Sequence, residues 1–269
     1  MKYIAHLLTD EDYREKATEY TKKHFIKKNR ILVDLNQKGV AITSKNFDNV
    51  WSELKEIIVH TGQHYDENMS SVFFDELSIP KPDYNLAVGS GNHGKQTAAM
   101  LEGIEEICLK ENPDCLLVYG DTNSTIAGGL AASKLRIPLI HVEAGIRSYN
   151  KTMPEEINRI MCDHASTLLF TPTTTGIDNL TKEGFTINAE KPYHIDNPRV
   201  YHCGDVMYDN SLHFSNVSDQ KSTILEDIGV QGDYILSTIH RDNNTDIPER
   251  LESIFKALHD ISKTCQVVL

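Results

Sequence analysis

The sequence predicts an α/β protein built on parallel β-sheets. Along most of the 269 residues, uninterrupted apolar runs alternate with segments of helical periodicity. The apolar runs lack an alternation of apolar and polar residues, which is typical of parallel strands covered on both faces. Polar side chains stand directly after several of these runs. Open α/β sheets bind their ligands at the carboxyl ends of the strands, so the same pattern predicts where a site would lie.

The expected elements follow one another in the order of the chain. The expected strands are 56–62, 115–121, 139–145, 168–173, 199–204, 234–240 and 266–269. The expected helices are 95–112, 124–136, 154–165, 174–184 and 247–263. In the first of these helices, Met100, Ile104 and Ile107 recur at helical spacing and share one face. The third opens with Pro154 and two acidic residues, which suits the first turn and the dipole of a helix.

Composition narrows the classes of function. The chain has 27 Lys and Arg residues against 39 Asp and Glu residues, a formal net charge of −12. This balance argues against broad affinity for nucleic acid or an anionic membrane, so neither is an expected partner. The sequence shows neither a signal peptide nor an apolar run long enough to span a membrane. The five scattered cysteines predict neither a metal site nor a disulfide framework, and they favour a cytoplasmic location.

Four expected strands are followed by a polar side chain. These side chains are Gln63, Asp121, Glu143 and His240. Together they would form a polar cleft suited to acid–base chemistry. The alternative for Asp121 is that it caps the next helix, a common position for aspartate. Glu143 is followed by Ala144-Gly145 and not by a helix, so capping explains it less well.

Six motifs, in this order and spacing, resemble those of the non-hydrolysing UDP-N-acetylglucosamine 2-epimerases. They are VHTGQHYDENM, VYGDTNST, HVEAGIRS, MPEEINR, GDVMYD and STIHRDNN, and the resemblance covers about residues 55–269. The motifs also resemble the branch that acts on UDP-2,3-diacetamido sugar acids in surface polysaccharide synthesis. The resemblance implies two Rossmann-like domains with the active site between them, the arrangement called GT-B.

The resemblance also implies an activity without cofactor or metal. Members of the family eliminate UDP from the substrate, which leaves a 2-acetamidoglucal. They then add UDP back to this intermediate, and the product has the opposite configuration at C2. Matching the motifs implies proton-transfer roles for Asp121, Glu143 and Glu155, and substrate contact for His240. Other matched residues would contact the substrate or a second, activating UDP-sugar; they are Gln63, His64, Gln96 and Arg241. The family also implies a homodimer.

Both ends of the chain depart from the family's pattern. Residues 1–50 form an atypical N-terminal segment without the family's nucleotide-binding Arg and Lys motif. Residues 51–215 are expected to form the Rossmann-like domain, and 216–269 a partial second one that begins in a polar connection over 215–233. We therefore expect turnover near background from this chain. The alternative function is a non-catalytic remnant that binds a nucleotide sugar, and a GT-B glycosyltransferase fits the motifs less well.

Overall fold

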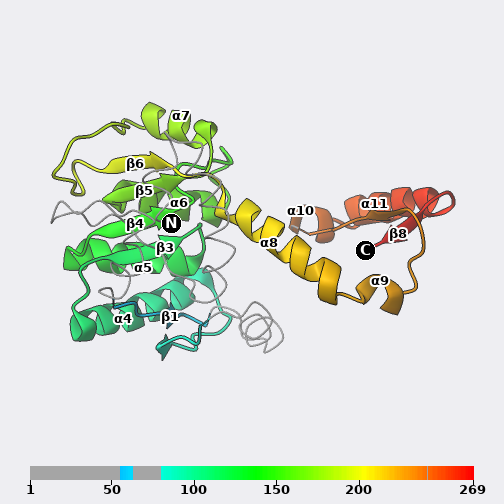
Figure 1. The fold of residues 1–269 in the computed structure, drawn as a ribbon, viewed down its shortest axis with the longest axis horizontal. Helices are drawn as coiled ribbons and strands as arrows, with labels where there is room; N and C mark the ends of the chain where they lie inside the picture. Colours follow the sequence, from blue (N-terminus) through cyan, green and yellow to red (C-terminus); the bar gives the residue numbers. More distant parts are fainter. Residues whose placement is uncertain (1–54, 63–79, 241) are drawn as a thin grey trace. The chain divides into compact units, whose positions relative to one another are not determined.

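The computed structural model describes residues 55–62, 80–240 and 242–269 (Figure 1). The chain divides into two compact units between Tyr208 and Asp209. The sequence predictions for residues 1–50 lie outside the described residues.

The first unit is built on a parallel sheet of four strands in the order β3-β4-β5-β6. The strands are β3 (Leu116–Tyr119), β4 (Leu139–Val142), β5 (Leu168–Thr171) and β6 (Arg199–His202). A further parallel pair consists of β1 (Val59–His60) and β2 (Tyr84–Asn85). The predicted class, an α/β fold with parallel strands and alternating helices, is confirmed.

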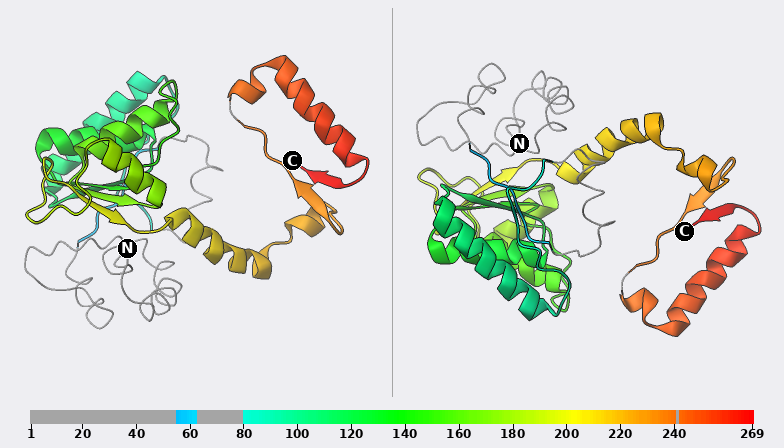
Figure 2. Two further views of the ribbon diagram at one scale, coloured as in Figure 1. Left: turned by 90° about the horizontal axis from the view of Figure 1, so that it is seen from above. Right: turned by 90° about the horizontal axis from the view of Figure 1, so that it is seen from below.

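Four helices accompany this sheet, and the views in Figure 2 show them on one side of it. They are α4 (His93–Glu111), α5 (Asn123–Leu135), α6 (Pro154–Ala165) and α7 (Thr174–Lys182). Strands that neighbour one another in the sheet also follow one another in the chain, so right-handed crossovers place all the connecting helices on one face. Helix α5 approaches β3 closely at Gly128, where a Cβ atom would lie 2.8 Å from Cγ1 of Val118.

Side chains alternate between the two faces of the sheet, and this decides which residues meet the helices. Leu139 packs with Val118 and with Ala132 of α5 on the helix-covered face. The next residue along β4, Ile140, belongs to an apolar cluster with Phe170 on the opposite face. Because the period of a strand is two residues, His141 returns to the helix-covered face, directly before the turn that carries Glu143.

The second unit contains a short parallel pair of strands and a longer helix. Its elements are α8 (Val206–Lys221), which begins just before the boundary, α9 (Ile224–Asp227), β7 (Tyr234–Leu236), α10 (Asp242–Thr245), α11 (Pro248–Ser262) and β8 (Gln266–Val268). Helices α8 and α9 occupy much of the stretch that the sequence predicts as a connection. Of the helices described, none is both long and apolar enough to cross a membrane.

Candidate active site

Two acidic side chains lie at the carboxyl ends of neighbouring strands. Asp121 follows β3 after Gly120, and Glu143 directly follows β4. The two strands are parallel and paired in register from Leu116 with Leu139 onward, so both acids lie at one edge of the sheet. The Gly120 amide donates a hydrogen bond to the Val142 carbonyl at 3.0 Å, which carries the pairing one residue beyond the strands.

The turn after β4 has an unusual backbone. Glu143 has φ 70°, in the left-handed region that residues other than glycine seldom adopt. Gly145, two residues later, has φ 78°. Gly120 in the neighbouring turn leaves room for the glutamate, because a Cβ atom there would lie 3.2 Å from Oε2 of Glu143. Strained backbone of this kind clusters at functional sites, which draws attention to Glu143.

Arg159 of α6 lies between the two carboxylates. Its Nη1 is 2.8 Å from Oδ2 of Asp121, and its Nη2 is 3.5 Å from Oε2 of Glu143. The arginine side chain is 11% exposed, and its Nε is buried without a hydrogen-bond partner in the described structure. One buried guanidinium therefore holds the carboxylates of two separate strand ends together.

The environment also changes the acidity of Glu143. Burial raises the pKa of its carboxyl, and the nearby Asp121 carboxylate raises it further, while Arg159 opposes the shift. On balance the pKa lies above that of an ordinary glutamate, so Glu143 retains its proton to a higher pH. A carboxyl that keeps its proton beside an ion-paired carboxylate is an arrangement suited to acid–base catalysis.

The capping alternative for Asp121 does not hold. Thr122 is the N-cap of α5, and its hydroxyl accepts a hydrogen bond from the Thr125 amide. The Thr125 hydroxyl in turn accepts from the Thr122 amide at 3.1 Å, which completes a capping box. The carboxylate of Asp121 is therefore not needed by the helix, and it pairs with Arg159.

The two acids at the start of α6 have different environments. Glu156 is buried and accepts hydrogen bonds from the amides of Ser148 and Tyr149, at 2.7 Å and 3.1 Å. Burial alone would raise the pKa of Glu156, but the bonds from Ser148 and Tyr149 lower it on balance. Glu155 is partly exposed, and nothing in the described part of the chain forms a hydrogen bond or ion pair with it. Glu155 precedes Arg159 by one helical turn, so the two residues lie on the same side of α6.

Gln96 of α4, a predicted contact for substrate or activator, is buried within the first unit. Its Nε2 donates to the carbonyl of Gly89 at 2.8 Å, and its Oε1 accepts from Nδ2 of Asn123 at 2.7 Å. The side chain thus ties the loop before α4 to the start of α5. Its contact with a ligand stays a prediction.

The remaining predicted site residues belong to the second unit or lie outside the described residues. His240 is exposed after β7 in the second unit, where its carbonyl accepts a hydrogen bond from Asn244 at 3.0 Å. Three others lie outside the described residues; they are Gln63, His64 and Arg241. Across residues 55–62, 80–240 and 242–269, no group of three or more His, Cys, Asp or Glu side chains could hold a metal ion.

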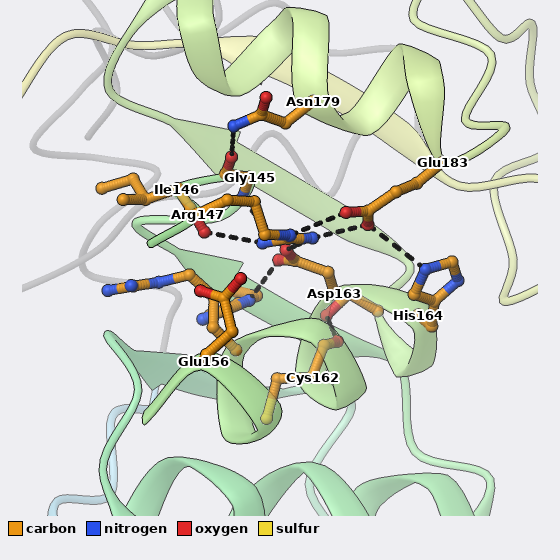
Figure 3. Close-up of polar contacts among 12 residues, drawn as sticks. Gly145, Ile146, Arg147, Glu156, Cys162, Asp163, His164, Asn179 and Glu183 are labelled. Carbon is orange, nitrogen blue, oxygen red and sulfur yellow. Dashed lines mark hydrogen bonds and ion pairs between the residues drawn. The ribbon is translucent and has the colours of Figure 1, made fainter. Parts of the chain in front are cut away.

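A buried polar network contacts the turn that carries Glu143, and the sequence did not predict it. Asp163 of α6 receives a hydrogen bond from the Gly145 amide at 3.0 Å and pairs with Nη2 of Arg147 at 2.7 Å (Figure 3). Arg147 also makes two hydrogen bonds to the carboxylate of Glu183, at 2.7 Å and 2.6 Å. Asp163 further contacts His141, 22 positions earlier in the chain. No local pattern in the sequence predicts this network. Arg159 could have been predicted as a site residue, because it follows Glu155 by four residues and so lies on the same side of the helix.

Comparison with known proteins places the chain among nucleotide-sugar epimerases. The family model described as UDP-N-acetylglucosamine 2-epimerase matches residues 49–269. A UDP-N-acetylglucosamine 2-epimerase homolog of Methanococcus maripaludis is 54% identical over 205 residues, which are 76% of this chain and 54% of the relative. A UDP-2,3-diacetamido-2,3-dideoxy-D-glucuronate 2-epimerase of Pseudomonas aeruginosa is 53% identical over 208 residues, which are 77% of this chain and 55% of the relative.

A solved structure gives the same answer. The UDP-GlcNAc 2-epimerase of Methanocaldococcus jannaschii, in complex with UDP-GlcNAc and UDP, superimposes with a TM-score of 0.70 at 41% identity. The match covers 80% of this chain and 57% of that one. The chain spans about half the length of the curated relatives it matches. The residue pattern, the parallel fold and these matches agree, and the chain belongs to the UDP-N-acetylglucosamine 2-epimerase family.

Proposed function

We propose that this chain takes part in the epimerisation of a UDP-2-acetamido sugar at C2, with Asp121, Glu143 and Glu155 as the proton-transfer groups. The observation that carries the proposal is the pairing of Asp121 and Glu143 with a single arginine at one edge of the sheet. The shifted pKa of Glu143 supports it, because proton transfer to and from carbon needs both a base and an acid.

The reaction requires proton transfer on both faces of the sugar ring. A carboxylate removes the proton from C2 while the bond between C1 and the UDP oxygen breaks, which leaves a double bond between C1 and C2. UDP then adds back to C1, and a carboxylic acid delivers a proton to the opposite face of C2. No oxidant or reductant is consumed, so carboxyl groups that exchange protons suffice for this part of the chemistry.

Two substrates are the candidates to test. Identity is 54% to the UDP-N-acetylglucosamine 2-epimerase homolog of M. maripaludis and 53% to the diacetamido-glucuronate epimerase of P. aeruginosa. We therefore infer that UDP-N-acetylglucosamine and a UDP-2,3-diacetamido uronic acid are to be tested side by side. His240, with Gln63, His64, Gln96 and Arg241, would contact the substrate or a second, activating UDP-sugar, and the active form would be a homodimer.

The test is proton NMR of each UDP-sugar in D2O, with a high concentration of this chain and an incubation of hours. The expected result is slow loss of the C2 proton signal and growth of the C2 epimer, both absent for Glu143→Gln. Lys134→Met, which changes an exposed residue of α5, is the matched control and should behave as wild type. Binding seen by saturation transfer without any exchange at C2 would instead support the nucleotide-sugar-binding alternative, and absence of both would overturn each proposal.

A further inference from the structure

We propose that His141 and Asp163 are positioning residues that fix the two turns carrying Asp121 and Glu143. This inference rests on the proposed function, because it assigns a role in placing that function's proton-transfer groups. His141 is distant in sequence from the turn that carries Asp121, and Asp163 is distant in sequence from the turn that carries Glu143. Both side chains are fully buried, at 0% exposure.

The histidine reaches the first turn. Its Nε2 lies 2.8 Å from the carbonyl oxygen of Gly120, the residue directly before Asp121. Its Nδ1 lies 2.7 Å from Oδ1 of Asp163. A backbone carbonyl can only accept a hydrogen bond, so the nitrogen that faces Gly120 must carry a proton.

The aspartate reaches the second turn. Its Oδ2 accepts from the Gly145 amide at 3.0 Å, two residues after Glu143, and pairs with the Arg147 guanidinium at 2.7 Å. Two such donors favour the ionised carboxylate. An ionised Asp163 is an acceptor, so the His141 nitrogen that faces it is placed to donate a hydrogen bond.

This pair of side chains therefore connects both turns through backbone atoms. The chain of contacts runs from the Gly120 carbonyl through His141 and Asp163 to the Gly145 amide. The carbonyl of Gly145 is held as well, by Nδ2 of Asn179 at 2.9 Å (Figure 3). The Gly145 residue is thus fixed at both its amide and its carbonyl.

Stability alone does not account for this arrangement. Well-packed apolar residues often stabilise a core as much as a buried ion pair does. Apolar side chains could not, however, bind the Gly120 carbonyl and the Gly145 amide, and buried backbone groups need partners. The pair is expected to define where the turns lie more than it adds to the free energy of unfolding.

The first experiment uses the wild-type chain and needs no activity. Nitrogen-15 NMR of the His141 ring at neutral pH should show both nitrogens with the chemical shift of the protonated type. One protonated and one unprotonated nitrogen would overturn the proposed contact chain.

The second experiment compares amide hydrogen exchange in Asp163→Asn with that in Ser166→Ala. Ser166→Ala removes another buried side-chain hydrogen bond, to the Cys162 carbonyl at 2.6 Å, at the end of the same helix. Exchange of the Gly120 and Gly145 amides should accelerate about tenfold or more in Asp163→Asn only, as expected when a hydrogen bond to a charged group is lost. Acceleration spread evenly over the sheet, or none at the turns, would contradict the positioning role. If Asp163→Asn does not fold, His141→Gln is measured in the same way.

The activity measurement separates this inference from the proposed function. In the C2 exchange assay, Asp163→Asn should lose about 10²-fold in kcat with little change in KM, the scale of a catalytic group misplaced by 1 Å. Ser166→Ala should retain the wild-type kcat. If the wild-type chain gives no exchange, the proposed function fails, while the amide exchange still decides whether the pair holds the turns. If the wild type is active and Asp163→Asn equals it, the positioning role alone fails.

Discussion

Replacing Arg159 by methionine tests the central contact of the site. Methionine retains an unbranched apolar stem but leaves the carboxylates of Asp121 and Glu143 without their shared cation. Breaking a fully buried ion pair costs about 3–5 kcal/mol, and an exposed pair contributes about 0–1 kcal/mol. The two acidic side chains are 25% and 24% exposed, so solvent compensates for part of the loss. We expect the free energy of unfolding to fall by about 2 kcal/mol, between these limits.

The loss should depend on pH in a definite direction. Arg159 opposes the raised pKa of Glu143, so its removal raises the folded-state pKa further above the unfolded value. A folded state that binds more protons than the unfolded state loses stability as pH rises through the folded-state pKa. The destabilisation of Arg159→Met relative to wild type should therefore be greater at about pH 8 than at about pH 5.

Urea denaturation followed by circular dichroism at the two pH values measures both effects. Lys134→Met removes an exposed positive charge from α5 and should change stability by less than about 0.5 kcal/mol at either pH. Arg159→Lys keeps the charge but loses the forked geometry, so it should fall between wild type and Arg159→Met. An Arg159→Met chain as stable as the Lys134→Met control at the higher pH, or equally destabilised at both, would refute the reasoning.

Three further predictions concern other parts of the chain. Gly145→Ala should lower the free energy of unfolding, measured by urea denaturation, by about 2–4 kcal/mol. Alanine would be strained in this left-handed backbone conformation, and its Cβ atom would lie 2.6 Å from the Gly176 carbonyl oxygen. Gly184→Ala, at φ 94° with open space around it, should cost only about 1 kcal/mol, and equal losses would contradict the steric argument. Burial raises the pKa of the Cys162 thiol to about 12. A thiol reagent at neutral pH should therefore label the partly exposed Cys265 in the native protein, and it should label Cys162 only after unfolding. Amides of β7, whose three residues are all exposed, should exchange faster than those of the fully buried β4, and equal protection would show that the second unit folds more firmly than its burial indicates.

The fold was predictable where burial leaves a pattern in the sequence. The strands β3 to β6 and the helices between them coincide with apolar runs and helical periodicity, because the central strands β4 and β5 are buried along their whole length and the helices bury residues against the sheet. Strand β2 has only two residues, too few to show a pattern. Helix α8 buries none of its residues, so its sequence lacks the periodicity that would have predicted it.

The site was predictable only in part, for a related reason. Asp121 and Glu143 could be expected at one edge because parallel strands place their carboxyl ends together. The sequence does not reveal that His141 and Asp163 meet, since they belong to a strand and a helix 22 positions apart. Which of the two adjacent acids is engaged also depends on tertiary structure, because Ser148 and Tyr149 approach Glu156 only after folding.

The left-handed backbone at Glu143 sets folding and activity against each other at one position. Residues other than glycine and asparagine pay about 1–3 kcal/mol to adopt such a conformation. In a library carrying all amino acids at position 143, sorting by the amount of folded protein should enrich glycine and asparagine. Sorting the same library by turnover should retain glutamate. Sequence design that optimises stability alone would therefore remove the carboxylate on which the proposed chemistry depends.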